Sequence, residues 1–162
     1  ELNLRTYVTR DGVPSVYFFS LDAQGVASVL GARLFHHLPY FYARVSLDWA
    51  DGRVRFRSRR RHPGARPARY EATYWPTGEP FAAPDDPLAA FLAERYRFYT
   101  QAPDGSLRYT DVAHDPWTLY PAAAEVETDT LLAAGGFARP DAGPPYFYSP
   151  GLDVRASTSK RV

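Results

Sequence analysis

The chain has 162 residues, of which 45% are hydrophobic and 23% charged, and its formal net charge is +1. This composition excludes intrinsic disorder, fits one domain, and gives no general reason to expect a nucleic-acid or membrane partner. The absence of cysteine excludes disulfides, thiolate catalysis and cysteine metal sites, and Lys160 is the only lysine. No apolar run has the roughly 18 residues of a membrane span, and we expect a cytoplasmic protein.

The first part of the chain predicts two strands and a helix. Residues 2–8 alternate in polarity, Asp11-Gly12 is a turn sequence, and residues 16–21 form an apolar run typical of a strand covered on both faces. Asp22 is then expected to cap a helix over residues 23–35. The buried stripe of this helix, at helical spacing, is expected to consist of Val26, Val29, Leu30 and Leu34.

A β-hairpin is predicted next. Residues 40–49 alternate between apolar and polar side chains, and they are followed by the hairpin turn sequence Asp51-Gly52. A two-residue turn at this place pairs Trp49 with Val54, so that the apolar partners share one face. The core-facing residues of the first strand are therefore expected to be Phe41, Ala43, Val45, Leu47 and Trp49.

The rest of the chain predicts more strands and two short helices. Alternation indicates strands at residues 70–74, 96–100, 107–112 and 118–126. Asp86-Pro87 is expected to begin a helix whose apolar stripe extends to Arg95, and residues 129–134 are expected to form a short helix. Residues 156–162 are expected to be a frayed or appended tail.

Arginines are concentrated in one segment, residues 53–69. Arg53, Arg55, Arg57 and Arg59 alternate along the second strand of the predicted hairpin, and the segment contains no acidic residue. One interpretation is an anion or nucleic-acid surface over Arg53–Arg69. We favour a solvated sheet face, because no exposed aromatic residues suitable for base stacking are interleaved with these arginines.

The histidines do not predict a metal site. His36-His37 are adjacent, so on a helix their side chains point about 100° apart and cannot easily share one ion. Asp111, His114 and Asp115 lie close together in the sequence and could supply a carboxylate–imidazole pair. The sequence HDPW indicates a turn that presents His114 to a pocket. We expect no metal and no other cofactor.

Glu1, Asn3 and Arg5 share one face of the first predicted strand, because side chains alternate with a period of two. If this face lines a cavity, the acid, the amide and the guanidinium form a charged, mutually paired site. If it faces water, the three side chains are an ordinary exposed edge. Periodicity alone leaves both alternatives open.

Six blocks, in order along nearly the whole chain, carry a family resemblance. They are ELNLRTYV at 1–8, YFFSLDA at 17–23, GARLFHHLPY at 31–40, FLAERY at 91–96, HDPW at 114–117 and YSPGLDV at 148–154. Through these blocks the chain resembles the YqjF-like family of uncharacterised bacterial proteins. Members of that family usually carry a further N-terminal portion, which we expect to be missing here.

That family is similar, more distantly, to the acetoacetate decarboxylase-like superfamily. The resemblance implies a β-dominated α+β fold over residues 1–155: a curved, cone-like antiparallel β-barrel with two or three helices packed outside. Its lumen is expected to hold a small keto or carboxylic acid. A barrel without its N-terminal portion exposes strand edges, so we also expect edge pairing in a homo-oligomer.

The enzymes of the superfamily carry a pocket glutamate, a glycine-led motif that closes a helix, and a Pro-Lys step whose lysine forms a Schiff base. The resemblance places Glu1 at the glutamate, Gly31-Ala32-Arg33 at the glycine-led motif and Pro39-Tyr40 at the Pro-Lys step. Tyr40 then occupies the position of the amine nucleophile. A phenol cannot form an imine with a ketone, so the Schiff-base route is excluded for this chain.

The strand face and the resemblance together favour a small-molecule site in the lumen. The candidate ligand-binding residues are Glu1, Asn3, Arg5, Arg33, Tyr40, Tyr42 and Arg44. The catalytic candidates are Glu1, Tyr40 and His114, with Glu1 a general base if burial raises its pKa. The sequence leaves open whether the protein is an enzyme.

Two other functions remain open at this stage. The first is a non-catalytic structural or oligomerising relative, in which a filled barrel leaves no space for a ligand. A cavity of about 300 Å³ or more favours a ligand over this alternative. The second, weaker alternative is nucleic-acid binding through Arg53–Arg69.

Overall fold

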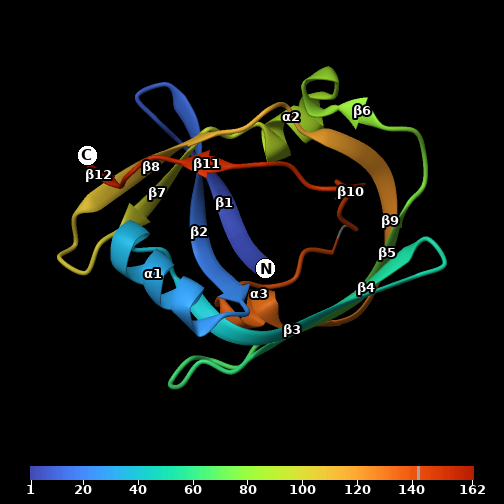
Figure 1. Ribbon diagram of the computed structural model, residues 1–162, viewed down its shortest axis with the longest axis horizontal. Coiled ribbons are helices and arrows are strands. Elements are labelled where there is room, and N and C mark those ends of the chain that lie inside the picture. Colours follow the sequence, from blue (N-terminus) through green and yellow to red (C-terminus); the bar gives the residue numbers. More distant parts are fainter. Residues whose placement is uncertain (142) are drawn as a thin grey trace.

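A computed structural model describes residues 1–141 and 143–162, without the side chain of residue 28, and one strongly curved sheet dominates it (Figure 1). Within these residues the strands are β1 (Leu2–Arg10), β2 (Val13–Ala23), β3 (Tyr40–Ala50), β4 (Arg53–Arg60), β5 (Arg69–Pro76), β6 (Phe81–Ala82), β7 (Arg97–Gln101), β8 (Leu107–Ala113), β9 (Thr118–Asp129), β10 (Tyr146–Tyr148), β11 (Arg155–Ala156) and β12 (Lys160–Arg161). The helices are α1 (Val26–His36), α2 (Pro87–Ala93) and α3 (Leu131–Ala134), with a 3-10 turn at Ala83–Asp85. The predicted β-dominated chain with two or three helices is confirmed.

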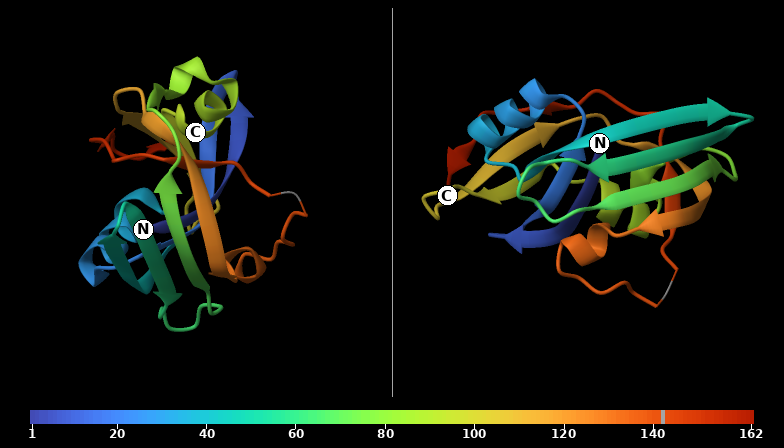
Figure 2. Two further views of the ribbon diagram at one scale, coloured as in Figure 1. Left: turned by 90° about the vertical axis from the view of Figure 1, so that its right-hand side faces the viewer. Right: turned by 90° about the horizontal axis from the view of Figure 1, so that it is seen from below.

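The sheet has two parts, here called wings, that meet where β2 pairs with β3 (Figure 2). One wing runs from β3 through β4, β5 and β9 to β10, and the other runs from β2 through β7 and β8 to β11. The strand order is β10-β9-β5-β4-β3-β2-β7-β8-β11, and β1, β6 and β12 attach to β2, β9 and β8 respectively. β2 runs parallel to both β3 and β7. The prediction of a wholly antiparallel sheet is therefore wrong at these two junctions. Parallel neighbours need a crossover connection, which α1 provides between β2 and β3.

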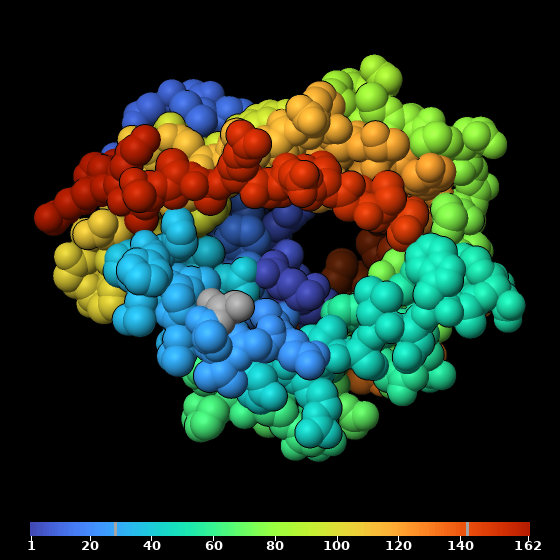
Figure 3. Space-filling view, in the orientation of Figure 1, coloured from blue at the N-terminus to red at the C-terminus, as the bar shows by residue number. Residues whose placement is uncertain are grey.

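The two ends of the sheet, β10 and β11, are not paired with each other in the part of the chain that the structure describes. The sheet is thus curved and open among the described residues, and the predicted barrel is not confirmed. In the space-filling view a hollow lies between the first residues of the chain, the C-terminal segment and the β3–β4 hairpin (Figure 3).

Two Asp-Gly turns set the register of the long hairpins. Asp11 and Gly12 have φ angles of 51° and 75°, and Asp51 and Gly52 have φ angles of 52° and 71°. Both central residues of a type I′ turn need a positive φ, which explains this residue pair at each turn. The predicted pairing of Trp49 with Val54 across β3 and β4 is confirmed.

The buried face of the β3–β4 hairpin is smaller than predicted. Ala43 is fully buried, but Leu47 and Trp49 are 59% and 57% exposed, so the predicted core face of β3 is wrong at these two positions. β2 pairs with β3 only over Tyr40–Tyr42, so at Leu47 and Trp49 the strand β3 has β4 on one side and no paired strand on the other among the described residues, which leaves these side chains little cover. On β4 burial alternates strictly, with exposed arginines between the buried side chains of Val54, Phe56, Ser58 and Arg60.

Helix α1 differs from its prediction in two ways. It begins at Val26 behind Gly25, because Asp22 is a buried residue of β2 and does not cap the helix. Of the expected stripe only Val29 is buried, whereas Val26, Leu30 and Leu34 are exposed. Helix α2 begins as predicted, with the Asp86 carboxylate accepting a hydrogen bond from the Ala89 amide, but it ends at Ala93 and leaves Arg95 outside.

A buried ion pair explains the position of Asp22. The guanidinium of Arg60 on β4 binds the Asp22 carboxylate with Nη2–Oδ1 and Nε–Oδ1 distances of 2.6 and 2.9 Å. The side chains of Arg60 and Asp22 are 4% and 1% exposed, and the Arg60 guanidinium lies 4.1 Å from the centre of the Phe41 ring. This pair connects β2 to β4 at the junction of the two wings.

The C-terminal segment is paired with the sheet. Arg155–Ala156 and Lys160–Arg161 form two short antiparallel ladders with β8. The amide of Ser157 also donates to the carbonyl of Asp111 at 2.9 Å. The expectation of a frayed tail over residues 156–162 is therefore wrong, because the edge of β8 offers free backbone groups that these residues satisfy.

Candidate functional site

A cavity of about 330 Å³ lies against β1, β2 and β7. Of the candidate site residues predicted from the sequence, it is lined by Glu1, Asn3, Arg5, Tyr40 and His114. Its apolar wall includes Phe18, Phe98 and Trp117. Glu1, Asn3 and Arg5 are exposed, so the cavity opens to solvent along β1.

Tyr40 and Glu1, both in the lining of the cavity, are hydrogen-bonded to each other. The Tyr40 hydroxyl donates to Glu1 Oε2 at 2.5 Å. Burial raises the pKa of Tyr40 above its ordinary value of 10.0, and the hydrogen bond to Glu1 and the charge of Glu1 raise it further. The phenol is therefore protonated at neutral pH. Glu1 is exposed, so the burial that a general base would need is not found.

Two arginines line the cavity without a carboxylate partner among the described residues: Arg5 on β1 and Arg95 after α2. Arg5 Nη2 donates to the carbonyl of Leu92 at 2.9 Å, and Arg95 Nη1 donates to the carbonyl of Glu94 at 2.9 Å. Both guanidiniums lie beside the ring of Tyr7, at 5.6 and 5.5 Å from its centre. Besides the carboxylate of Glu1, the cavity lining therefore holds two guanidiniums that form no ion pair with an acid of the described residues.

His114 lies at the cavity as predicted, but without a carboxylate. Its Nδ1 is 2.7 Å from the carbonyl oxygen of Asp115, which makes Nδ1 the protonated nitrogen. Its ring stacks on Tyr96 at 4.6 Å. Asp111 binds Arg97 at 2.7 Å instead of His114, so the carboxylate–imidazole pair suggested by the sequence is not formed.

Arg33, Tyr42 and Arg44, three of the predicted ligand-binding residues, do not line this cavity. Arg33 Nη1 donates to the backbone carbonyl of Tyr40 at 2.6 Å. The Tyr42 amide donates to Nδ1 of His62 at 3.2 Å. Arg44 lies in a separate hollow on the outer face of the sheet. Alternation along β3 grouped Tyr42 and Arg44 with Tyr40, but they lie about 7 and 13 Å farther along the strand and are not part of the lining.

Sequence reasoning missed Arg95, Arg97 and Trp117 as cavity residues. Arg95 was assigned to a helical stripe, although α2 ends two residues before it. A signal was present, because Arg95 and Trp117 fall in the FLAERY and HDPW blocks. These blocks lie far from Glu1 in the sequence, and only the fold brings them to β1.

A second cavity of about 410 Å³ shares Arg5, Ala93 and Trp117 with the first. Its wall is largely aromatic and apolar, with contributions from Leu119, Tyr146 and Phe147. A molecule bound at Arg5 therefore has an apolar compartment beside it.

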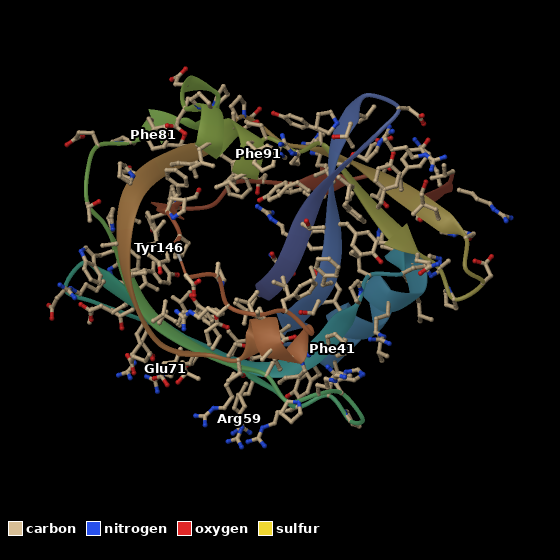
Figure 4. All side chains as sticks on the ribbon, turned by 180° about the vertical axis from the view of Figure 1, so that it is seen from behind. Phe41, Arg59, Glu71, Phe81, Phe91 and Tyr146 are labelled. Atoms are coloured by element: carbon tan, nitrogen blue, oxygen red, sulfur yellow. The ribbon has the colours of Figure 1, made fainter. Side chains whose placement is uncertain are left out.

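The arginine-rich segment lies on the opposite, outer face of the sheet. Arg59 and Glu71 extend away from the centre of the molecule (Figure 4). Arg57 binds Asp48 at 2.9 Å, and Arg55 binds Glu71 at 2.7 Å. These pairs fit the interpretation of a solvated, partly neutralised sheet face.

The described residues contain no group of three or more His, Asp or Glu side chains that could hold a metal ion. None of their helices is long and apolar enough to cross a membrane. Lys160, the only lysine, donates to Asp111 at 3.2 Å and does not line the cavity.

Comparisons with known proteins agree with the predicted resemblance. A family model for DUF2071, described as an uncharacterized conserved protein, matches residues 1–153. The uncharacterized protein YqjF of Bacillus subtilis (strain 168) is 44% identical over 154 residues, which are 95% of this chain and 62% of YqjF. The chain thus spans less than two thirds of that relative's length. The crystal structure of acetoacetate decarboxylase from Legionella pneumophila matches 96% of this chain and 60% of its own, with a TM-score of 0.53 and 14% identity. This last likeness concerns the fold alone.

Proposed function

The chain belongs to the DUF2071 family, and we propose that it binds a small carboxylate- or carbonyl-bearing molecule in the cavity beside β1. The observation that carries the proposal is the pair of arginines, Arg5 and Arg95. Each guanidinium donates to a backbone carbonyl but forms no ion pair with an acid of the described residues. Arginine binds a carboxylate through two parallel N–H groups, so these two side chains suit a carboxylate ligand.

Tyr40 supports a position for a ligand carbonyl in the same cavity. Its raised pKa keeps the hydroxyl protonated, so it is a hydrogen-bond donor at neutral pH. In the free protein that proton is donated to Glu1. A ligand carbonyl or hydroxyl oxygen would compete with Glu1 as the acceptor of the hydrogen bond from Tyr40. A keto acid presents two groups, carboxylate and carbonyl, that suit the arginines and the tyrosine of this lining.

The adjoining aromatic cavity supports a ligand with an apolar tail. Arg5, Ala93 and Trp117 are common to both cavities, so a carboxylate at Arg5 can direct its substituent toward Phe147. Burial of apolar ligand surface contributes about 25 cal/mol per Å². We therefore expect phenylpyruvate to bind more tightly than pyruvate.

We also propose that this chain performs no Schiff-base decarboxylation. The alignment by resemblance puts Tyr40 at the position of the nucleophilic lysine, and Lys160 is bound to Asp111 outside the cavity. Borohydride treatment in the presence of acetoacetate should leave the mass of the protein unchanged. A covalent adduct would contradict this part of the proposal.

A non-catalytic relative with a filled interior is the competing function. The volume of about 330 Å³ favours a ligand over this alternative, because ligand cavities typically measure about 300–1,000 Å³. Nucleic-acid binding has less support, since Arg55 and Arg57 are already paired with acids.

Calorimetric titration with four probes tests the proposal: pyruvate, phenylpyruvate, acetate and acetone. We expect pyruvate to bind more tightly than acetate, and acetone to bind weakest. Arg95→Gln should weaken pyruvate binding by about tenfold or more, since a hydrogen bond to a charged group contributes about 1.5–3 kcal/mol.

Arg10→Gln is the control, because Arg10 lies on β1 like the cavity arginine Arg5, but pairs with Asp11 and lines neither cavity. It should leave the affinity for pyruvate unchanged. Equal losses in the two variants, or no binding of any acid by the unmodified protein, would contradict the proposal.

A further inference from the structure

We propose that Arg44, Arg59 and Arg69 form a second binding site, on the outer face of the sheet, for the phosphate group of a small phosphorylated molecule. The three residues form one row across three neighbouring strands. Arg44 of β3 is opposite Arg59 of β4, and Arg59 is opposite Arg69 of β5. Neighbouring strands are about 4.8 Å apart, so three guanidinium-bearing side chains start from adjacent positions on one face.

The row lines a hollow in the surface. The three arginines border a volume of about 220 Å³, together with Arg57, Ser46 and Thr128. Ser46 and Thr128 carry hydroxyl groups, which can donate hydrogen bonds to an anion. A phosphate placed in this hollow would meet several donors that come from different strands.

The charges around the row are unevenly distributed. Farther along β4, Arg55 binds Glu71 and Glu127 at 2.7 and 3.1 Å, and Arg57 binds Asp48 at 2.9 Å. Among the described residues that line the hollow Glu71 is the only acid, and it is already engaged by Arg55 and Arg57.

No acidic residue in the described part of the chain forms an ion pair with Arg44, Arg59 or Arg69. Like charges directly opposite each other destabilise a sheet. The row therefore lowers the stability of the free protein, and a bound anion would remove the repulsion.

Phosphate fits this arrangement better than a monocarboxylate does. A phosphate monoester carries a charge of about −1.5 to −2 at neutral pH and offers three acceptor oxygens. Arginine forks match its geometry. The row crosses the strands within one hollow and does not form an extended track, so it suits one phosphate group better than a nucleic-acid backbone. The site is separate from the cavity at Arg5 and Arg95, which lies on β1 and after α2.

The test uses the whole chain with pyrophosphate and inorganic phosphate at constant ionic strength, read by calorimetry and by thermal unfolding. Both anions should bind and raise the midpoint of unfolding, with pyrophosphate binding more tightly. Arg59→Gln, at the centre of the row, should weaken binding by tenfold or more. The same variant should be at least as stable as the unmodified protein in phosphate-free buffer, because the repulsion is reduced. An arginine with a merely structural role would give the opposite stability result.

Arg53→Gln is the control, because Arg53 lies on the same face of the same strand but contacts Glu125 and the Trp75 ring. It should bind pyrophosphate as tightly as the unmodified protein does. Equal losses in Arg53→Gln and Arg59→Gln, or no phosphate binding at constant ionic strength, would overturn the proposal. A single-stranded oligonucleotide that binds with length-dependent affinity, while pyrophosphate does not bind, would overturn it in favour of a nucleic-acid surface.

Discussion

Replacement of Arg60 by methionine breaks the buried ion pair that connects β4 to β2. The variant leaves the Asp22 carboxylate, 1% exposed, without the hydrogen bonds of 2.6–3.1 Å that it accepts from Arg60. Removal of one partner from a buried pair costs about 3–5 kcal/mol. The lost contact with the Phe41 ring adds roughly 0.5–2 kcal/mol.

The size of this loss should depend on pH. Burial already raises the pKa of Asp22 above 3.8, against the effect of Arg60, so without Arg60 the folded-state pKa should rise further. A carboxyl whose pKa is higher in the folded state than in the unfolded state stabilises the fold less as the pH rises through that interval. We therefore expect Arg60→Met to lose more unfolding free energy at pH 7 than at pH 4. At the lower pH, where protonation of Asp22 relieves the uncompensated charge, the loss should be about 3 kcal/mol.

Urea denaturation followed by tryptophan fluorescence measures the deficit. Arg57→Met is the matched control on the same strand, because its pair with Asp48 is exposed and should contribute no more than about 1 kcal/mol. The double variant Asp22→Leu/Arg60→Met should recover much of the lost stability. An Arg60→Met variant within 1 kcal/mol of the unmodified protein at pH 7 would refute the reasoning.

Three further predictions concern local features. Gly52→Ala should lower the unfolding free energy by about 1–2 kcal/mol in urea, because residue 52 has a φ of 71° and no steric clash adds to the strain; an unchanged midpoint would contradict this. Asp86→Ala should cost about 1 kcal/mol in the same assay, since the carboxylate caps α2; a stabilised variant would rule out the cap. The hydrogen bond from Arg97 lowers the pKa of Asp111, so its contribution is fully present above pH 3.8 and is lost as the pH falls through the folded-state pKa. Acid titration should therefore show a small advantage over Asp111→Asn at pH 6 that disappears near pH 2, whereas a constant difference would show that the charge of Asp111 is not responsible.

Local signals predicted much of the fold. Asp51-Gly52 has the backbone conformation that its residue types favour, and this turn alone determines the pairing of Trp49 with Val54. Asp86-Pro87 likewise specifies where α2 begins. Each of these features depends on neighbours in the sequence, so propensity and periodicity are sufficient to find them.

Long-range contacts account for the errors. Asp22 is as good a helix cap by composition as Asp86, but Arg60, 38 residues away, binds it within the sheet. Tyr42 and Arg44 follow the alternation of Tyr40, yet neither lines the cavity, and Arg44 borders a different hollow. Neither the partner of a side chain nor the extent of a cavity along a strand can be read from periodicity.

The candidate site was predicted in part. The face formed by Glu1, Asn3 and Arg5 does line a cavity, and Tyr40 contacts Glu1 there. Arg95 was not predicted, because its position depends on the end of α2 and on the packing of that region against Tyr7. Of the two arginines that suggest a ligand, Arg5 was therefore predicted from the sequence, whereas Arg95 is identified only in the folded chain.

A crystal structure of the protein with saturating phenylpyruvate tests the central claim most directly. Our account predicts the ligand carboxylate at the guanidiniums of Arg5 and Arg95, the carbonyl within hydrogen-bonding distance of Tyr40, and the phenyl ring toward Phe147. A cavity without ligand at saturation, or a ligand bound with its carboxylate away from both arginines, would contradict it.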